Sequence, residues 1–369
     1  MTVFYEVKME NITKPDLLSL TRAELCELVR SVSANEPQYR VDQIYKQLQS
    51  GIELSQMTNI PKALKMRLEE VSQSRLPKIH TRLVSAIDGT VKYLFELYDG
   101  NCIESVVMKY KHGNTICIST QVGCRMGCRF CASTIGGRVR DLTSGEMLGQ
   151  ILVAQKDIGE RISNVVMMGI GEPLDNYGNT VRFLHALNSP DGLNIGYRHV
   201  SLSTCGIVPK IYELASLNLP ITLSISLHAP TDEARSEIMP INKKYPISEL
   251  MEACREYYSE NGRRISFEYT LIAGKNDSPE QATALASLLN ASLRRGGSGM
   301  PIHVNLIPVN DVTESGFKRS GKSSIEKFAA VLESKGIRAT VRRRLGPDIN
   351  ASCGQLRRKS AEQSSATEQ

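Results

Sequence analysis

The sequence predicts an α/β fold, a partial (β/α)6 barrel that follows a small N-terminal helical domain and a linking β-hairpin. The chain has 369 residues, 41% of them apolar, which at about 100 to 200 residues per domain allows two or three domains with a sizeable core. Apolar residues at helical spacing occupy its first part, and beyond residue 112 short β-rich runs alternate with helical stretches. This alternation is typical of a parallel sheet whose active site lies at the C-terminal ends of the strands.

Residues 1–80 are predicted to form a helical accessory domain, in which apolar residues such as Leu25 and Val29 repeat at the spacing of a buried helix face. Residues 81–112 contain two strand-like runs on either side of the turn Tyr98–Asn101. These runs are Lys92–Leu97 and Ile103–Met108. We therefore expect a hairpin that links the helical domain to the barrel.

Six short β-rich runs follow one another in the barrel region, residues 113–345. They are Thr115–Thr120, Asn164–Ile170, His199–Thr204, Ile221–Leu227, Ile265–Ile272 and Ile302–Ile307. The helical stretches between or after them are Ser144–Asp157, Thr180–Asn188, Ile247–Asn261, Pro279–Leu293 and Ser323–Ser334. The runs are apolar rather than alternating, which favours a parallel sheet buried on both faces, either open or curled into a partial barrel. A last run, Arg338–Arg342, precedes a motif-like segment, 346–359, and a Ser/Gln/Glu-rich tail, 360–369, that we expect to be disordered.

Composition excludes several classes of protein. No run of 18 apolar residues occurs, and acidic residues interrupt the first 16 positions, so we expect no membrane span and no signal peptide. Nine cysteines, five of them between Cys102 and Cys131, fit metal or thiol chemistry in a reducing cytoplasm better than a secreted disulfide framework. The net charge is +6, and Lys335–Gln369 holds 8 basic against 3 acidic residues. Such a basic end is compatible with nucleic acid, although a solvated charged face is the commoner explanation.

The most specific signal is a C-x3-C-x2-C cluster formed by Cys124, Cys128 and Cys131 just after the first parallel run. Three thiolates on one loop can converge on a metal centre, whereas a structural zinc site normally has four closed ligands. An iron-sulfur cluster usually takes four cysteines, so three local ones indicate a cluster with one iron open to a substrate or cofactor. A zinc site with a remote fourth ligand, such as His112 or Cys102, remains the alternative.

This cluster at the end of the first barrel strand resembles that of the radical S-adenosylmethionine enzymes, which hold a [4Fe-4S] cluster with three cysteines. Six further motifs, together with the run that leads into the cluster, occur in the order found in the RlmN/Cfr family of RNA adenosine methyltransferases. The seven motifs are Ser119–Cys124, Met168–Leu174, Ser201–Thr204, Ser226–Pro230, Met239–Asn242, Asn305–Asn310 and Asp348–Leu356. The similarity covers about residues 18 to 358 and is far more specific than a single glycine-rich loop.

The resemblance implies a set of cofactor-binding residues. Cys124, Cys128 and Cys131 would bind the cluster, and S-adenosylmethionine would chelate the open iron. The residues implied to bind S-adenosylmethionine are Gly171, Glu172, Ser203, Ser226, Leu227, His228 and Asn310. From the residues alone, glycines at a strand end also fit an ordinary turn, and a histidine there is more often a structural residue.

The resemblance also implies the reaction. Cys353 would be methylated by one S-adenosylmethionine, and a 5′-deoxyadenosyl radical from a second would abstract hydrogen from that methyl group. The resulting carbon radical would add to adenine, whose ring carbons are too electron-poor to attack a sulfonium. Cys117 would release the product by forming a disulfide with Cys353, and Glu104 matches the proposed proton acceptor. Without the resemblance, Cys117 could be simply buried and Glu104 a solvated strand residue.

Within the family, the motifs favour methylation of carbon 2 of an adenosine in the peptidyl-transferase region of 23S rRNA, and of the adenosine 3′ of the anticodon in some tRNAs. Two alternatives remain: a Cfr-like enzyme acting on carbon 8, and a non-enzymatic zinc or iron-sulfur RNA-binding protein. Tyr39–Tyr45 resembles part of the RNA-contacting accessory domain, but the first 100 residues are neutral in charge, so the electrostatic case for RNA rests on Arg342–Arg344 and Arg357–Lys359. By the same resemblance we expect a monomer reduced by a flavodoxin-type protein.

Overall fold

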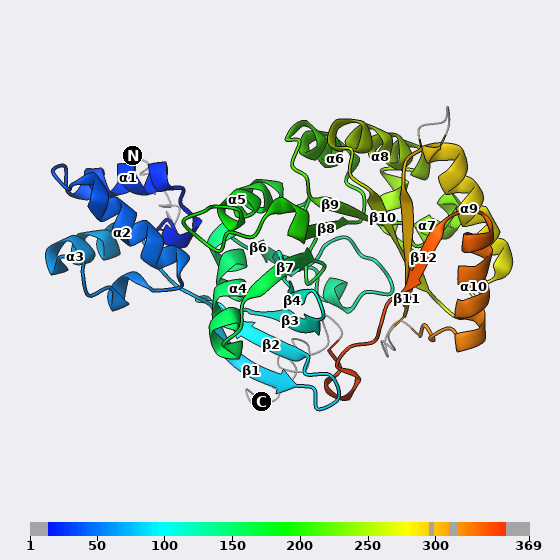
Figure 1. Ribbon diagram of the computed structural model, residues 1–369, viewed down its shortest axis with the longest axis horizontal. Helices are drawn as coiled ribbons and strands as arrows, with labels where there is room; N and C mark the ends of the chain where they lie inside the picture. The colour runs from blue at the N-terminus through cyan, green and yellow to red at the C-terminus, as the bar shows by residue number, and fades with distance from the viewer. Residues whose placement is uncertain (1–13, 295–298, 310–315, 352–369) are drawn as a thin grey trace, which may run out of the picture.

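The computed structural model describes residues 14–294, 299–309 and 316–351. In this part of the chain ten strands form one sheet in the order β1-β2-β3-β4-β7-β8-β9-β10-β11-β12. Figure 1 shows the helical module at one end of the molecule and the α9–α10 layer at the other. The parallel part of the sheet is an incomplete barrel, because β4 and β12, at its two ends, do not pair with each other in the described chain.

The parallel strands confirm the predicted β/α series. They are β4 (Gly113–Cys117), β7 (Ile162–Met167), β8 (Val200–Thr204), β9 (Thr222–Ser226), β10 (Ile265–Leu271), β11 (Ile302–Pro308) and β12 (Arg338–Val341). Each of the six predicted runs forms one strand, and the run after residue 337 adds a seventh, β12, parallel to β11. β10 is buried along its whole length, as expected for a strand covered on both faces. β8 and β11 instead alternate buried and half-buried residues, so the expectation of non-alternating strands is wrong for these two.

Helices follow the strands and cover the sheet. They are α4 (Ser144–Ile158), α5 (Tyr177–Leu187), α6 (Val208–Ser216), α7 (Asp232–Ile238), α8 (Ile247–Asn261), α9 (Pro279–Leu293) and α10 (Lys322–Ser334). The five predicted helical stretches are confirmed to within three residues at each end. The two shorter helices, α6 and α7, were not separated from the surrounding loops in the sequence.

Three antiparallel strands precede the barrel: β1 (Lys78–Val84), β2 (Val91–Glu96) and β3 (Cys102–Tyr110). The predicted hairpin is the β2–β3 pair, in which Leu94 lies opposite Glu104. β3 also pairs with β4, so the hairpin continues the sheet directly into the barrel. β1 is an additional edge strand, largely exposed, whose mixed polar sequence carries no strong strand signal.

The N-terminal module consists of α1 (Arg22–Val32), α2 (Gln38–Gln49) and α3 (Lys62–Val71). α1 begins with a capping box, in which the Thr21 hydroxyl accepts from the Glu24 amide and the Glu24 carboxylate accepts from the Thr21 amide. The module docks on the start of α4, where the Gly145 amide donates to the Ser19 hydroxyl at 2.8 Å, and on α5, where Arg182 pairs with Glu24 at 2.6 Å.

After β12 the chain returns across the molecule to the hairpin. Figure 1 shows this red segment beside the turn between β1 and β2, far from α10, which precedes it in sequence. The segment ends its described part at Ala351, whose side chain packs with Leu345 against a small cluster made by Val106, Met108 and Cys117. Within the described residues, no helix has the length and apolar character needed to cross a membrane.

Candidate active site

The three motif cysteines lie on one loop between two short paired strands. Cys124 follows β5 (Gln121–Gly123), and Cys131 precedes a single 3-10 turn that leads to β6 (Arg138–Asp141). Gly123 has φ +78°, and an added Cβ would run into the Gly137 carbonyl. The loop can therefore close between β5 and β6 only with glycine at this position.

The thiols of this loop interact electrostatically. Burial, with a contribution from Cys131, raises the pKa of Cys124 to about 12, and burial with the charges of Cys131 and Cys124 also raises the pKa of Cys128. Among the described residues, no three His, Cys, Asp or Glu side chains are close enough to share a single metal ion. A zinc site that the motif cysteines would form with His112 or Cys102 is therefore not assembled among these residues. A [4Fe-4S] cluster sets a looser requirement, because each cysteine binds a different iron.

Glu172 and Gly171 follow β7 at the edge of the cysteine loop. Gly171 has φ +109°, and an added Cβ would lie 2.7 Å from Gln121 and Thr120 atoms, so the chain here approaches β5 as closely as glycine allows. Glu172 is buried, and its carboxylate accepts hydrogen bonds from the Leu174 amide at 3.0 Å and the Cys205 amide at 2.7 Å. Burial raises the pKa of this carboxyl.

A buried arginine that the sequence analysis did not single out connects the strand ends around Glu172. The Arg235 guanidinium, fully buried on α7, donates to the carbonyls of Cys205 at 2.7 Å, Ser226 at 3.1 Å and Leu227 at 3.1 Å. Its burial lowers its pKa. Because these carbonyls follow β8 and β9, Arg235 fixes the relative positions of two loops that carry predicted S-adenosylmethionine contacts.

The other predicted cofactor residues lie on the same side of the sheet. The hydroxyls of Ser203 and Ser226, on β8 and β9, are 3.4 Å apart. His228 is buried with φ +59°, and its Nδ1 accepts from the Thr270 amide at 2.9 Å. Burial, together with the charge of Arg235, lowers the pKa of this histidine to about 3. The neutral ring therefore has its proton on Nε2 and stacks edge-on against Phe130 of the cysteine loop at 4.8 Å.

Leu227 is fully buried, and its amide donates to the Glu268 carbonyl at 3.1 Å. Asn310 and Cys353 lie outside the described residues.

Cys117 and Glu104 are buried on the barrel's first strand and on the hairpin. Cys117 is 3% exposed and packs in the cluster that includes Leu345 and Ala351 of the returning C-terminal segment. Glu104 is 1% exposed, and its carboxylate lies 3.1 Å from the Lys92 ammonium. The burial of Cys117 matches a simple core cysteine, whereas Glu104 is not the solvated strand residue expected without the family resemblance, since it carries a buried charge with a partner.

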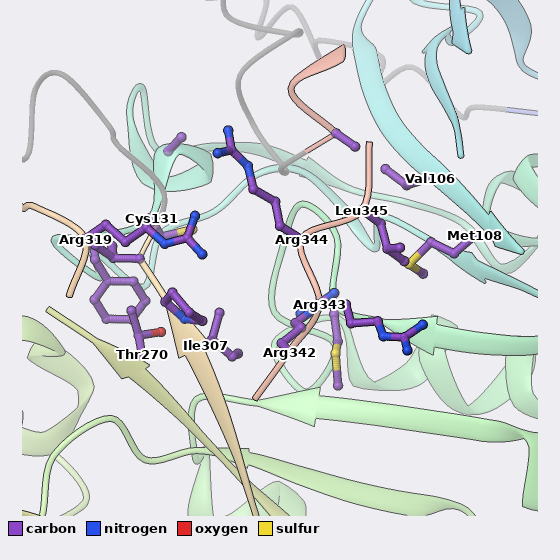
Figure 2. A pocket seen from close by; sticks show the side chains of 16 residues that line it. Val106, Met108, Cys131, Thr270, Ile307, Arg319, Arg342, Arg343, Arg344 and Leu345 are labelled. Carbon is purple, nitrogen blue, oxygen red and sulfur yellow. The ribbon is translucent and has the colours of Figure 1, made fainter. Parts of the chain in front are cut away.

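A cavity of about 250 Å³ lies between the cysteine loop, the hairpin and the segment after β12. Figure 2 shows Cys131 and Arg319 at one side of it and Leu345 with Met108 at the other, with the run Arg342–Arg344 between them. The strand ends Thr270 and Ile307 complete its floor. Four arginines thus line a partly apolar hollow beside the cysteine loop, a combination that suits a flat base carrying phosphates.

Comparison with known proteins identifies the family. The Radical SAM superfamily model matches residues 118–286. A protein from Clostridium botulinum (strain Eklund 17B / Type B), named "Probable dual-specificity RNA methyltransferase RlmN", is 58% identical over 88% of this chain and 91% of its own length. One of the same name from Clostridium novyi is 52% identical over 93% of this chain and 98% of its own. The chain belongs to the RlmN family.

A solved structure agrees with this assignment. The crystal structure of a radical SAM methyltransferase from Sphaerobacter thermophilus superimposes with a TM-score of 0.84 at 41% identity, covering 92% of this chain and 98% of that one. As an RlmN-family member, the protein is an S-adenosylmethionine-dependent radical RNA methyltransferase, with a [4Fe-4S] cluster and S-adenosylmethionine as its cofactors.

The residues present fit these cofactors. The cysteine loop supplies soft thiol ligands, and glycine at position 171 lets the chain after β7 lie directly against β5, beside that loop. Two buried hydroxyls, Thr120 Oγ1 beside Gly171 and Ser133 Oγ just after Cys131, have no hydrogen-bond partner within the part of the chain that the structure describes. Buried hydroxyls of this kind are normally satisfied, so both are available to a bound polar ligand.

Proposed function

We propose that this RlmN-family enzyme methylates carbon 2 of an adenosine in the peptidyl-transferase region of 23S rRNA, and of the adenosine 3′ of the anticodon in some tRNAs, through a methyl-cysteine on Cys353. The observation that carries the proposal is the cavity in which the cysteine loop, the arginine run and the segment leading to Cys353 meet. We further propose that the enzyme acts in the cytoplasm as a monomer, reduced by a flavodoxin-type protein.

In this proposal Cys124, Cys128 and Cys131 hold the cluster. S-adenosylmethionine would bind beside it, and the bound pair would supply one-electron radical chemistry. The predicted cofactor residues would orient S-adenosylmethionine: the Glu172 carboxylate accepts from its ammonium group, and the Ser203 and Ser226 hydroxyls reach its polar edges. The residues proposed for this role are Gly171, Glu172, Ser203, Ser226, Leu227, His228 and Asn310.

Ala351, the last described residue before the proposed methyl carrier, packs in the cluster that holds Cys117. Cys353 follows Ala351 by two residues, so at most about 7 Å of extended chain separates their Cα atoms. Since Ala351 packs in the same cluster as Cys117, the two thiols can meet without a large movement of the barrel. This proximity supports Cys117 as the thiol that resolves the adduct.

The product would leave in two balanced steps. The Glu104 carboxylate takes the proton from carbon 2 of the RNA adduct, and the electron pair of that C–H bond stays in the ring. The Cys117 thiolate then attacks Sγ of Cys353, the bond between that sulfur and the methylene breaks, and its electron pair goes to the methylene, which takes up a proton to become methyl. A disulfide between Cys117 and Cys353 remains for the reductant to open.

The RNA substrate would be held by charge and shape. The arginines at positions 319 and 342–344 surround the cavity mouth, where flanking phosphates would bind, while the apolar side chains of Phe130, Met108 and Leu345 would contact the base. An adenine edge inside folded RNA must leave its stack to enter a hollow of this kind.

Trapping the adduct tests the cysteine chemistry. The anaerobically reconstituted protein is incubated with methyl-labelled S-adenosylmethionine, reductant and unmodified 23S rRNA, and the Cys117→Ala variant is treated in parallel. We expect label on Cys353 before RNA is added, turnover to RNA with the native protein, and a covalent RNA–protein species with the variant. A Cys353→Ala variant that still methylates RNA would refute the methyl-cysteine route and leave the cofactor assignment intact.

A further inference from the structure

The segment that leads to Cys353 is tied to the turn between β1 and β2. Asp348 accepts two hydrogen bonds from this turn, one from the Ser85 hydroxyl at 2.7 Å and one from the Ala86 amide at 2.9 Å. In the opposite direction the Gly346 amide donates to the Asp88 carboxylate at 2.9 Å. Residues 346–351 therefore have a fixed place beside the hairpin, although they are about 260 residues away in sequence.

The tied segment is itself a closed turn. The Ala351 amide donates to the Gly346 carbonyl at 3.1 Å, and Gly346 has φ +56°, where an added Cβ would lie 2.7 Å from the Ala351 side chain. Burial opposes ionisation of Asp88, but hydrogen bonds from Gly346 and Thr90 lower its pKa to about 2. The Asp88 carboxylate is thus charged throughout the physiological range and remains a strong acceptor for this turn.

A buried lysine connects this segment to the proposed proton acceptor. Lys92 is 1% exposed, and its ammonium lies 3.1 Å from the Glu104 carboxylate and donates to the Asn350 carbonyl at 3.0 Å. Lys92 pairs with Val106 across the hairpin, and Leu94 pairs with Glu104, which makes Lys92 and Glu104 diagonal neighbours on one face of the sheet. One side chain therefore contacts both the carboxylate and the backbone three residues before Cys353.

We propose that Lys92 is a positioning residue that ties the Glu104 carboxylate to the segment carrying Cys353. This inference rests on the proposed function, in which the adduct on Cys353 gives its ring proton to Glu104. The ammonium has two effects. It stabilises the negative carboxylate in a buried place, and it keeps residues 346–351 within reach of that carboxylate. When Glu104 takes the proton, its electron pair forms the new O–H bond, and Lys92 remains as the cation that holds the segment until the adduct is resolved.

The contacts allow the two effects to be separated by substitution. Lys92→Met removes both of them, and Lys92→Arg retains a cation of similar reach. Asp348→Ala loosens the segment alone, because Asp348 is exposed and contacts neither Lys92 nor Glu104. Lys109→Met is the matched control: Lys109 is on β3 and pairs at 2.6 Å with Glu160 on the protein surface.

The first measurement needs no turnover. Hydrogen exchange of the backbone amides of residues 85–92 and 346–351 is followed by mass spectrometry in the reconstituted protein without RNA. We expect exchange of the 346–351 amides to rise at least about fivefold in Lys92→Met and in Asp348→Ala, since hydrogen bonds that hold them are lost. Lys92→Arg and Lys109→Met should match the native protein. Unchanged exchange in both loosening variants would overturn the tether.

The second measurement separates loading, adduct formation and release, using methyl label on Cys353, the covalent RNA species and free methylated nucleoside. Lys92→Met should load Cys353 normally and accumulate the adduct. Its release step should slow by at least about tenfold, because Glu104 loses the cation that stabilises its buried carboxylate. Asp348→Ala should form less adduct, and Lys92→Arg should release product nearly as the native protein does.

Release by Lys92→Met at the native rate, or a slow release that Lys92→Arg shares, would refute the role of Lys92 toward Glu104. Should Lys92→Met not fold, the double variant Lys92→Met/Glu104→Gln removes both charges together; it should fold, load Cys353 and fail to release product. If the native protein shows neither labelled Cys353 nor adduct, the proposed function itself is wrong, and the exchange experiment still decides whether Lys92 holds the segment.

Discussion

A buried carboxyl where the helical module meets the barrel gives a prediction that can be worked out quantitatively. Asp16 accepts hydrogen bonds from the Ser19 hydroxyl at 2.7 Å and the Thr143 hydroxyl at 3.2 Å, next to the first turn of α4. Burial, assisted by the charge of Glu146, raises its pKa from 3.8 to about 6. The folded protein therefore binds this proton more tightly than the unfolded chain does.

The direction and size of the change in stability with pH follow from proton linkage. Between the two pKa values the folded state holds more protons than the unfolded state, so the free energy of unfolding falls as pH rises and levels off above the folded pKa. The full shift corresponds to a cost of about 3 kcal/mol at high pH, of which roughly half is present at pH 5, so about 1.4 kcal/mol is lost between pH 5 and 8. The N-terminus of α4 attracts an anion and acts in the opposite direction, which makes these values upper limits.

The assay compares native protein with Asp16→Asn. Asparagine keeps the carbonyl acceptor and can donate to the two hydroxyls, so the contacts stay while the charge is removed. The free energy of unfolding is measured by urea unfolding under anaerobic conditions, followed by circular dichroism at several pH values. The advantage of the variant over the native protein should be larger at pH 8 than at pH 5, by up to about 1.4 kcal/mol. A stability difference between the two proteins that does not vary with pH, or that increases towards pH 5, would refute the reasoning. The control is Asp191→Asn, which changes a carboxylate paired with Lys46.

Three further predictions concern the site. Gly171→Ala should destabilise the protein by more than about 2 kcal/mol and weaken S-adenosylmethionine binding, because a Cβ at φ +109° would be strained and would press on Gln121. Calorimetry measures both effects, and a variant with native affinity would contradict the close approach. Arg235→Met should cost at least about 3 kcal/mol in thermal unfolding, since buried carbonyls including that of Cys205 lose their donor; a neutral result would show that water replaces the guanidinium. Arg344→Ser should lower the slope of log K for RNA against log salt by about 0.7 to 0.9 if Arg344 binds one phosphate, and an unchanged slope would remove it from the RNA surface.

The barrel could be predicted from the sequence because short β-rich runs alternate with helical stretches along the chain. Burial could not be read from the pattern, since Ile265–Leu271 alternates apolar and polar residues and yet is buried at every position. β1 could not be predicted, since it is an edge strand whose charged residues face solvent. The short helix α7 lacked a visible apolar period over its 7 residues. What the structure adds to the fold is mainly the return of the chain after β12 to the hairpin.

Some residues of the candidate site could likewise be predicted from the sequence, and others could not. The three cysteines were found from spacing alone, whereas Glu104 was singled out only through the family resemblance, since a glutamate on a strand is ordinarily solvated. Lys92 had a signal that was not used: in the predicted hairpin it falls on the same face as Glu104, and both interrupt apolar runs. Arg235 had no signal in the sequence. Nothing in the neighbouring residues distinguishes an arginine that donates to three buried carbonyls from one on the surface of an amphipathic helix.

The position of the methyl group on the product tests the central proposal most directly. Unmodified 23S rRNA and a bulk tRNA preparation are treated with the anaerobically reconstituted native protein, reductant and methyl-labelled S-adenosylmethionine, then digested to nucleosides and resolved by mass spectrometry against authentic standards. The account predicts labelled 2-methyladenosine. Labelled 8-methyladenosine would contradict the proposed regiochemistry and assign the chain to the Cfr-like alternative, while label that stays on Cys353 without reaching either RNA would contradict the proposed substrates.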